Sequence, residues 1–202
     1  MNKWPPFCCV SAFFYNGLKT LRTPSPGSES DLARLLGTRV PPGVRNPFGL
    51  LEVENGEDTG VRPQNAAEVI NRALSATPFR FRHIPLRTIQ MEMYVDVASF
   101  ALDLGAVVGI GIDARILSTA TPGHRHVLKI ETIYDDLAGV FDDAGETRPP
   151  PIPWLELEMN SLSINDGLWI IGRKVDLSLP YCLPWDGGGQ NGAVCCQTEN
   201  RK

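Results

Sequence analysis

The sequence lacks the features that would place it in several specialised classes of protein. Its longest apolar run, at 105–112, falls well short of the roughly 20 residues that a membrane-spanning helix needs. The 19 basic and 23 acidic residues give a formal net charge of −4, and the lysines and arginines do not gather into a patch. We therefore expect neither a nucleic-acid partner nor a membrane partner.

Cysteine is scarce, with five residues at positions 8, 9, 182, 195 and 196, and histidine is scarcer, with three. The odd count and the two adjacent pairs do not fit a disulfide framework, and no CxxC motif predicts a zinc ribbon. The first seven residues hold one lysine and two prolines but no apolar core, which is not the pattern of a secretory signal. We expect reduced thiols, no metal, and a protein that is cytoplasmic or delivered to another cell without a cleaved signal peptide.

What the sequence does contain is enough for an ordinary globular core, because 43% of its 202 residues are hydrophobic. Apolar residues at helical spacing predict helices at 11–21, 28–36, 65–74 and 91–104. Ser28 and Asn65, each three residues before an acidic residue, are the expected N-caps of two of them. Shorter apolar segments predict strands at 84–89, 106–112, 126–133, 137–141, 155–159 and 167–172.

The order of these elements, helices first and then a run of antiparallel strands, indicates an α+β fold. Residues 38–63, between two of the predicted helices, are rich in Gly, Pro and Asn and are expected to form a long loop. We expect one domain over residues 1–175, followed over 176–202 by a loosely ordered tail that contains glycine and cysteine.

Two adjacent cysteines stand at the expected start of the first helix. Pro5 and Pro6 precede them, and because proline cannot lie inside a helix, the helix is expected to begin at the cysteines. A thiol there is close to the positive end of the helix dipole and to unpaired backbone N–H groups. Both lower the pKa of the thiol and favour the nucleophilic thiolate, so Cys8 is a candidate nucleophile. Cys9 stays an alternative.

A histidine and an aspartate lie on neighbouring strands of a predicted hairpin. His126 starts the first strand and Asp142 follows the second, and their separation around the turn at 135–136 lets both side chains face the same side of the sheet. A carboxylate that accepts one ring N–H orients an imidazole, whose other nitrogen can then face a thiol. His124 shares that strand face and stays an alternative base. His83 is expected to be a partly buried strand residue.

Several segments resemble known cysteine peptidases. Trp4-Pro-Pro-Phe-Cys8-Cys-Val-Ser-Ala resembles the segment around the nucleophile of phytochelatin synthase, where Pro-x-aromatic precedes Cys-Gly-Val-Ala. Residues 28–38 and 96–110 are similar to two helical segments of the bacteriocin-processing (double-glycine) peptidase-like domains. Residues 126–142 resemble the histidine strand, turn and aspartate strand of those domains, with the same spacing. All of these proteins belong to the papain-like cysteine peptidase superfamily, and the resemblance covers residues 2–172.

The resemblance implies a papain-like fold, in which an N-terminal helical lobe packs on an antiparallel sheet, and a Cys-His-Asp triad. Cys8 matches the nucleophile, His126 the general base and acid, and Asp142 the residue that orients the imidazole. Asn2 stands near the position of the oxyanion-hole glutamine of the family, and its shorter amide can donate the same hydrogen bond.

Two departures from the family pattern keep alternatives open. Cys9 stands where a glycine usually follows the nucleophile, and Asp143 stands where a proline often follows the aspartate, which makes Asp143 an alternative orienting acid.

The activity implied is that of a cysteine peptidase, which cleaves a peptide or isopeptide bond through a thioester. It requires a peptide or protein substrate and no cofactor, and it leaves room for a protein inhibitor or regulator. A thiol-dependent deamidase or transpeptidase with the same triad is an alternative, and so is a catalytically inert binding module.

Overall fold

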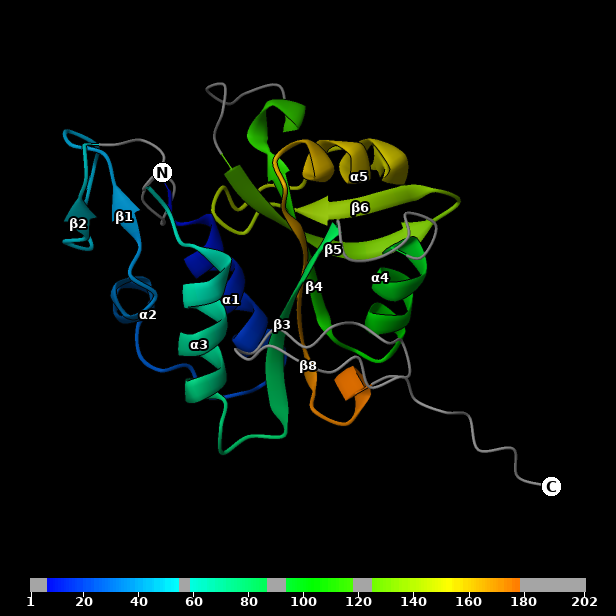
Figure 1. Ribbon diagram of the computed structural model, residues 1–202, viewed down its shortest axis with the longest axis horizontal. Coiled ribbons are helices and arrows are strands. Elements are labelled where there is room, and N and C mark those ends of the chain that lie inside the picture. The colour runs from blue at the N-terminus through cyan, green and yellow to red at the C-terminus, as the bar shows by residue number, and fades with distance from the viewer. Residues whose placement is uncertain (1–6, 55–58, 87–93, 118–124, 179–202) are drawn as a thin grey trace, which may run out of the picture.

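The computed structural model describes residues 7–54, 59–86, 94–117 and 125–178, and the fold is built on one six-stranded sheet (Figure 1). Every neighbouring pair of strands in it is antiparallel. In spatial order the strands are β3 (Phe79–Pro85), β8 (Gly167–Arg173), β4 (Val107–Asp113), β5 (Arg125–Tyr134), β6 (Leu137–Phe141) and β7 (Ile152–Pro153). The second and third strands in this order, β8 and β4, are almost wholly buried, because helices cover the sheet on both faces.

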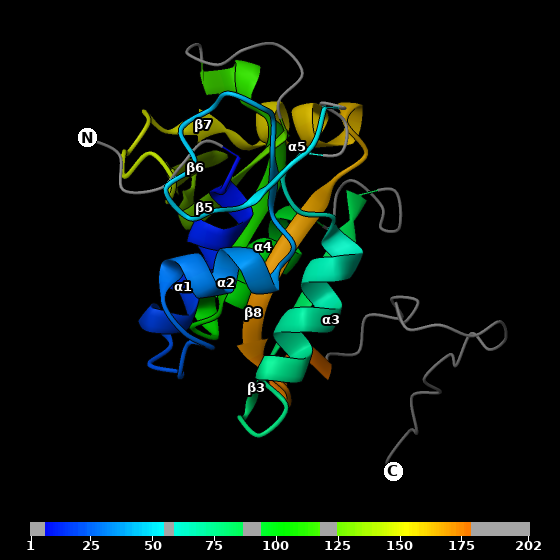
Figure 2. The same ribbon diagram turned by 90° about the vertical axis from the view of Figure 1, so that its left-hand side faces the viewer.

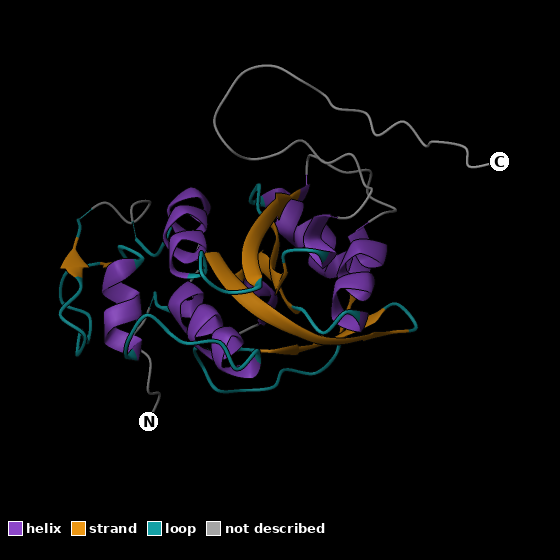
Figure 3. Cartoon of the chain, turned by 90° about the horizontal axis from the view of Figure 1, so that it is seen from below, coloured by secondary structure: helices purple, strands orange, loops and turns teal. Residues whose placement is uncertain are grey.

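The helices divide between the two faces of the sheet, as the view from below shows (Figure 3). On one side lie α1 (Cys9–Thr20), α2 (Glu29–Leu35) and α3 (Pro63–Ala73) (Figure 2). Buried side chains of these helices share a core with Val107, Val127 and Trp169. On the other side lie α4 (Tyr94–Asp103) and α5 (Trp154–Ser163), which pack on Ile110, Leu128 and Ile170. The alternation of side chains along each strand supplies both cores.

The first helix rests closely on the middle of the sheet because glycines leave room for it. A Cβ atom on Gly109 would lie 2.7 Å from the ring of Phe13, and one on Gly17 would lie 3.0 Å from the side chain of Ile171. Phe13 is fully buried in this contact. The sheet therefore fixes the position of the helix that carries the cysteine pair.

The structure confirms the α+β class and the antiparallel sheet. The strand predicted at 137–141 coincides with β6, and β4, β5 and β8 begin or end within a residue of their predicted limits. Ser28 caps α2 through a complete capping box with Asp31. In contrast, α3 begins at Pro63 rather than at Asn65, because proline fits the first helical position, and Arg62 is its N-cap.

Three further predictions need correction. The strand expected at 155–159 is wrong, because this segment belongs to α5. Its Leu-Glu-Leu-Glu alternation looks like a strand, but the buried residues follow the helical spacing i, i+3, i+4, i+7: Trp154, Leu157, Glu158 and Ser161. The long loop at 38–63 contains two short parallel strands, β1 (Arg39–Val40) and β2 (Leu51–Glu52). The strand expected at 84–89 begins earlier, at Phe79.

The described chain ends with η5 (Asp176–Ser178), a short 3₁₀ helix against the sheet. The rest of the expected tail lies outside the described residues, so the boundary at 175 stays a prediction. Within the described ranges, no helix is long and apolar enough to cross a membrane.

Candidate active site

The hairpin of β5 and β6 brings His126 and Asp142 together. His126 Nε2 and Asp142 Oδ1 are 3.0 Å apart, and both side chains are mostly buried. The same carboxylate oxygen accepts hydrogen bonds from the backbone N–H groups of Ala144 and Gly145, each at 3.0 Å. A Cβ atom on Gly145 would lie 2.6 Å from Asp142 Oδ2, so this turn needs a glycine. These two hydrogen bonds hold the carboxylate of Asp142 in place independently of the imidazole.

The thiol that contacts His126 belongs to Cys9. Cys9 is the first residue of α1 and only 7% exposed, and its Sγ lies 4.0 Å from the carbonyl oxygen of Arg125, beside the histidine in β5. Its side chain interacts with His126 both through a hydrogen bond and through charge. Since Nε2 of the imidazole is bonded to Asp142, Nδ1 is the nitrogen left for the thiol. Cys9 therefore interacts with His126, and His126 interacts with Asp142. We call these three side chains the relay.

The charges in this relay support one another. Burial alone would lower the pKa of His126, but the negative charge of Cys9 and the hydrogen bond and charge of Asp142 outweigh it and raise that pKa from 6.5 to about 10. Burial works against the ionised form of Asp142 as well. The His126 hydrogen bond and charge, with the two backbone N–H groups, nevertheless hold the pKa of Asp142 below its ordinary value. The arrangement therefore favours an imidazolium at His126 beside an ionised Asp142 carboxylate.

Cys8, the predicted nucleophile, does not lie in the surroundings that the sequence led us to expect. Cys8 is fully buried and packs with Ala12, Ala33 and Val40, in a cluster separate from the histidine. Burial, and then the neighbouring Cys9, raises the pKa of the Cys8 thiol to about 12, the opposite of the shift that its place at the helix start predicted. Successive side chains on a helix point about 100° apart, so two adjacent cysteines cannot face the same partner.

Asp143 does not replace Asp142 beside the imidazole. Its side chain is only 1% exposed and bonds instead to α1, where Asn16 Nδ2 donates to its Oδ1 at 2.9 Å. Lys129 Nζ lies 3.8 Å from the same oxygen. Asp143 thus connects the helix of the thiol with the strand of the histidine. The sequence prediction missed Asn16 and Lys129, because only the packed helix brings them to this carboxylate.

The remaining candidates fall into two groups. Asn2 and His124 lie outside the described residues, so their roles stay predictions. His83 is a partly buried residue of β3, as expected, and its Nε2 lies 3.0 Å from Asp166 Oδ1. In the ranges that the structure describes, no three His, Cys, Asp or Glu side chains gather into a metal site.

Comparisons with known proteins bear on the fold. No model of a known protein family matches the sequence, and no curated protein matches it. The structure is similar to the crystal structure of a "putative C39-like peptidase" from Bacillus anthracis, with a TM-score of 0.56 and 10% sequence identity. The match covers 85% of this chain and 91% of that chain. The chain has a C39-like, papain-like peptidase fold. At this identity the similarity concerns the fold alone.

Proposed function

We propose that the protein is a cysteine peptidase of the papain-like superfamily, with Cys9 as nucleophile, His126 as general base and acid, and Asp142 as the residue that orients the imidazole. One observation carries the proposal. A thiol at a helix N-terminus contacts an imidazole whose other nitrogen is held by a buried carboxylate, in a chain with a peptidase-like fold. A nucleophile, its base and the orienter of that base are the parts that thiol catalysis requires.

In the first half of the reaction, the Cys9 thiolate attacks the carbonyl carbon of the scissile amide, and the carbonyl oxygen becomes an oxyanion. Cys9 and Val10 open α1, where the first backbone N–H groups have no partner within the helix. These donors, and Asn2 as predicted, stabilise the oxyanion. The intermediate collapses as the imidazolium of His126 gives its proton to the leaving amine, and a thioester on Cys9 remains.

In the second half, water replaces the amine. Neutral His126 takes a proton from the water, and the hydroxide attacks the thioester carbonyl. The carboxylic acid leaves and the Cys9 thiolate is restored with the imidazolium. Asp142 keeps the ring in one orientation through both halves. A peptide or protein supplies the amide. A protein regulator and a cytoplasmic location stay predictions.

The proposal is tested with a library of peptides that release a fluorescent fragment on cleavage, followed by intact-mass analysis of the trapped protein. We expect the mass of the acyl group on Cys9. When a triad nucleophile is replaced, only the rate acceleration from substrate binding and the oxyanion hole remains. Cys9→Ala should therefore lower turnover by at least about 1,000-fold. Cys8→Ala is the matched control and should keep most of the activity.

Two results would contradict the proposal. Turnover that survives Cys9→Ala but not Cys8→Ala would return the nucleophile to Cys8. Unchanged turnover in both variants would show that the cleavage does not use this thiol pair.

A further inference from the structure

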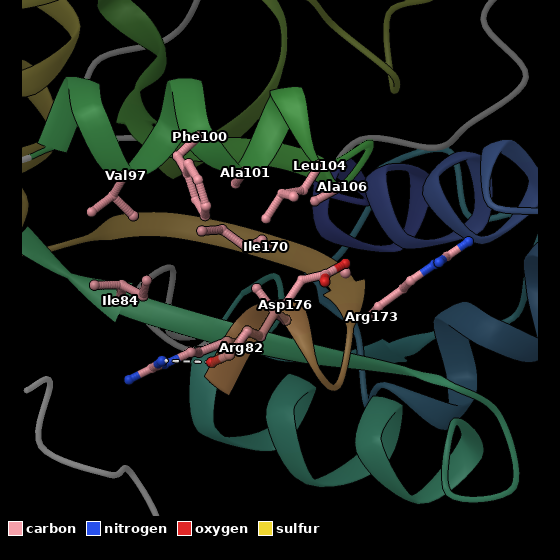
Figure 4. A pocket seen from close by; sticks show the side chains of 12 residues that line it. Arg82, Ile84, Val97, Phe100, Ala101, Leu104, Ala106, Ile170, Arg173 and Asp176 are labelled. Carbon is pink, nitrogen blue, oxygen red and sulfur yellow. Dashed lines mark hydrogen bonds between the residues drawn. The ribbon is translucent and has the colours of Figure 1, made fainter. Parts of the chain in front are cut away.

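A second feature of the molecule lies on the opposite face of the sheet from α1. It is an apolar groove between α4 and the strands β3 and β8, closed at one end by η5 (Figure 4). Phe100 of α4 and Leu104, which directly follows this helix, extend toward Ile170 on β8, and Ile84 of β3 continues the floor. We call it the α4 groove.

The α4 groove leaves apolar side chains uncovered. Phe100 is 41% exposed and Leu104 is 40% exposed, while the floor residues Ile84 and Ile170 are buried beneath them. The candidate active site does not use any of these residues, because Cys9, His126 and Asp142 are not among the residues that line the groove. An aromatic ring and a leucine exposed together over a hollow are typical of a docking surface.

We propose that the α4 groove binds the C-terminal segment of the same chain, residues 179–185, with Trp185 as its anchor. The segment reads Leu-Pro-Tyr-Cys-Leu-Pro-Trp and carries no charge. Its large apolar side chains match the chemistry of the groove. Its two prolines restrict the backbone, which reduces the entropy lost on docking.

The position where the described chain ends supports this occupant over a separate molecule. Leu177, in η5, is itself part of the groove wall, and Arg82 fixes η5 there by donating a hydrogen bond to the Leu177 carbonyl oxygen at 3.3 Å. The proposed segment begins two residues later. At up to about 3.5 Å per residue, seven residues extend to about 25 Å, enough to cross or turn back over the groove.

Charge at the rim fits the same segment. Arg173 ends β8 at the groove and extends away from the apolar floor (Figure 4). It is exposed, and among the described residues it has no ion-pair partner. Asp186 directly follows the anchor Trp185. When the indole occupies the groove, this carboxylate lies near the rim where Arg173 is available.

Covalent attachment makes weak contacts sufficient. A short tether holds a segment at an effective concentration of about 1 mM, so a segment with an intrinsic Kd of about 0.1 mM is docked in roughly nine molecules of ten. A separate molecule of the same intrinsic affinity would need to be present at that concentration. Docking within the chain is therefore independent of protein concentration.

The test uses the tryptophan emission of Trp185 in the full chain, obtained by subtracting the spectrum of Trp185→Phe from that of the unchanged protein. We expect emission at shorter wavelength than that of N-acetyltryptophanamide and weak quenching by acrylamide. Phe100→Asp should abolish both effects. Leu155→Asp is the matched control, because Leu155 is exposed on α5 outside the groove.

A second pair of variants guards against misfolding of Phe100→Asp. Arg173→Glu, at an exposed position, should shift Trp185 emission to longer wavelength, and the charge swap Arg173→Glu with Asp186→Arg should restore it. The proposal is overturned if Trp185 behaves as a fully solvated indole, or if neither groove variant changes its signal. Emission that shifts over a 100-fold dilution would show instead that a second copy supplies the segment, which also overturns it.

Discussion

Cys8 and Cys9 differ by one position in the chain, yet their surroundings are chemically opposite. Cys8 is buried among apolar side chains, and this burial raises the pKa of its thiol, whereas the Cys9 thiol interacts with the imidazole of His126. The relay depends on this single rotation along α1. It also makes the two thiols distinguishable by their reactivity.

We predict that Cys8 is inert toward alkylation in the folded protein. With a pKa of about 12, the Cys8 thiol is only about one part in 10,000 thiolate at pH 8, roughly 1,000-fold less than an ordinary exposed cysteine. The measurement is iodoacetamide labelling of Cys9→Ser, in which Cys8 is the only thiol of the N-terminal segment, followed by peptide mass analysis. The same variant in urea is the control and should be labelled fully. Labelling of folded Cys8 at the rate of an exposed thiol would refute the assignment.

A second residue-scale prediction concerns the acid that orients the imidazole. Asp142→Asn keeps the size of the side chain and an oxygen for Ala144 and Gly145, but removes the charge that helps to raise the pKa of His126 to about 10. That pKa should fall, so the basic limb of the activity profile should move to lower pH. Turnover should drop by roughly 100-fold, the lower end of what general acid–base catalysis contributes.

NMR titration of the His126 ring protons and the pH profile of kcat/KM measure these two effects separately. A basic limb that stays in place after Asp142→Asn would mean that the carboxylate does not stabilise the imidazolium.

The contact between His126 and Asp142 could be predicted from the sequence because a short hairpin makes it. Strand period and turn position together fix which side chains are neighbours. The choice between the two cysteines could not be made with the same evidence, since both lie at the helix start. One signal was present: Cys9 precedes Phe13 by four residues, and residues four apart share a helix face. Phe13 faces the sheet, and so does Cys9.

At the scale of elements, local patterns predicted most strands and helices, and failed where tertiary contacts decide. The Leu-Glu-Leu-Glu stretch of α5 fits a strand over five residues and a helix over ten. Glu158 is buried and accepts a hydrogen bond from the Trp154 indole at 3.0 Å. Its burial depends on how the helix packs, which the local sequence pattern does not contain. The small strands β1 and β2 pair with each other in parallel, across a connection that no local pattern reveals.

Asp143 joins two elements, and its ionisation makes that junction pH-dependent. Burial raises its pKa to about 6, while Lys129 and the Asn16 hydrogen bond act in the opposite direction. The nearby carboxylates of Asp142 and Glu131 raise it further. Because this pKa lies above the value of 3.8 expected in the unfolded chain, the folded state binds the proton more tightly. The associated stability is complete below pH 3.8 and is lost as the pH rises through 6.

We predict that Asp143→Asn becomes more stable relative to the unchanged protein as the pH rises from 4 to 7. The gain in the free energy of unfolding should be on the order of 2–3 kcal/mol, since each pKa unit corresponds to about 1.4 kcal/mol. Urea unfolding at several pH values measures it. Asp142→Asn is the control and should show no such gain, because the pKa of Asp142 is lowered rather than raised. A difference that is flat with pH would contradict the prediction.

At the scale of the whole molecule, one carboxylate contacts three strands of the sheet: it forms hydrogen bonds to β8, lies beside His83 of β3 and packs against β4. Asp166 Oδ1 accepts hydrogen bonds from the Trp169 indole at 2.9 Å and from the Gly167 backbone N–H at 2.8 Å, and it lies 3.0 Å from His83 Nε2 on β3. The carboxylate fills the space above Gly111 of β4, where a Cβ atom would overlap it. Trp169 and Asp166 are both almost fully buried.

The last prediction tests the contact between Asp166 and Gly111 with a double-mutant cycle. Gly111→Ala should destabilise the protein by about 1–3 kcal/mol, because its methyl group displaces the Asp166 carboxylate from its donors. Asp166→Ala should cost a similar amount, because it leaves the buried Trp169 and Gly167 N–H groups without their acceptor. In the double variant the new methyl group occupies the space that the carboxylate vacates, so the combined loss should fall short of the sum by about 1 kcal/mol or more. Gly109→Ala is the matched control, because a Cβ atom there meets Phe13 instead, and its effect should add to that of Asp166→Ala. Free energies from urea unfolding of all the variants decide the matter: equal coupling at both glycines would show that Asp166 does not depend on the gap at Gly111.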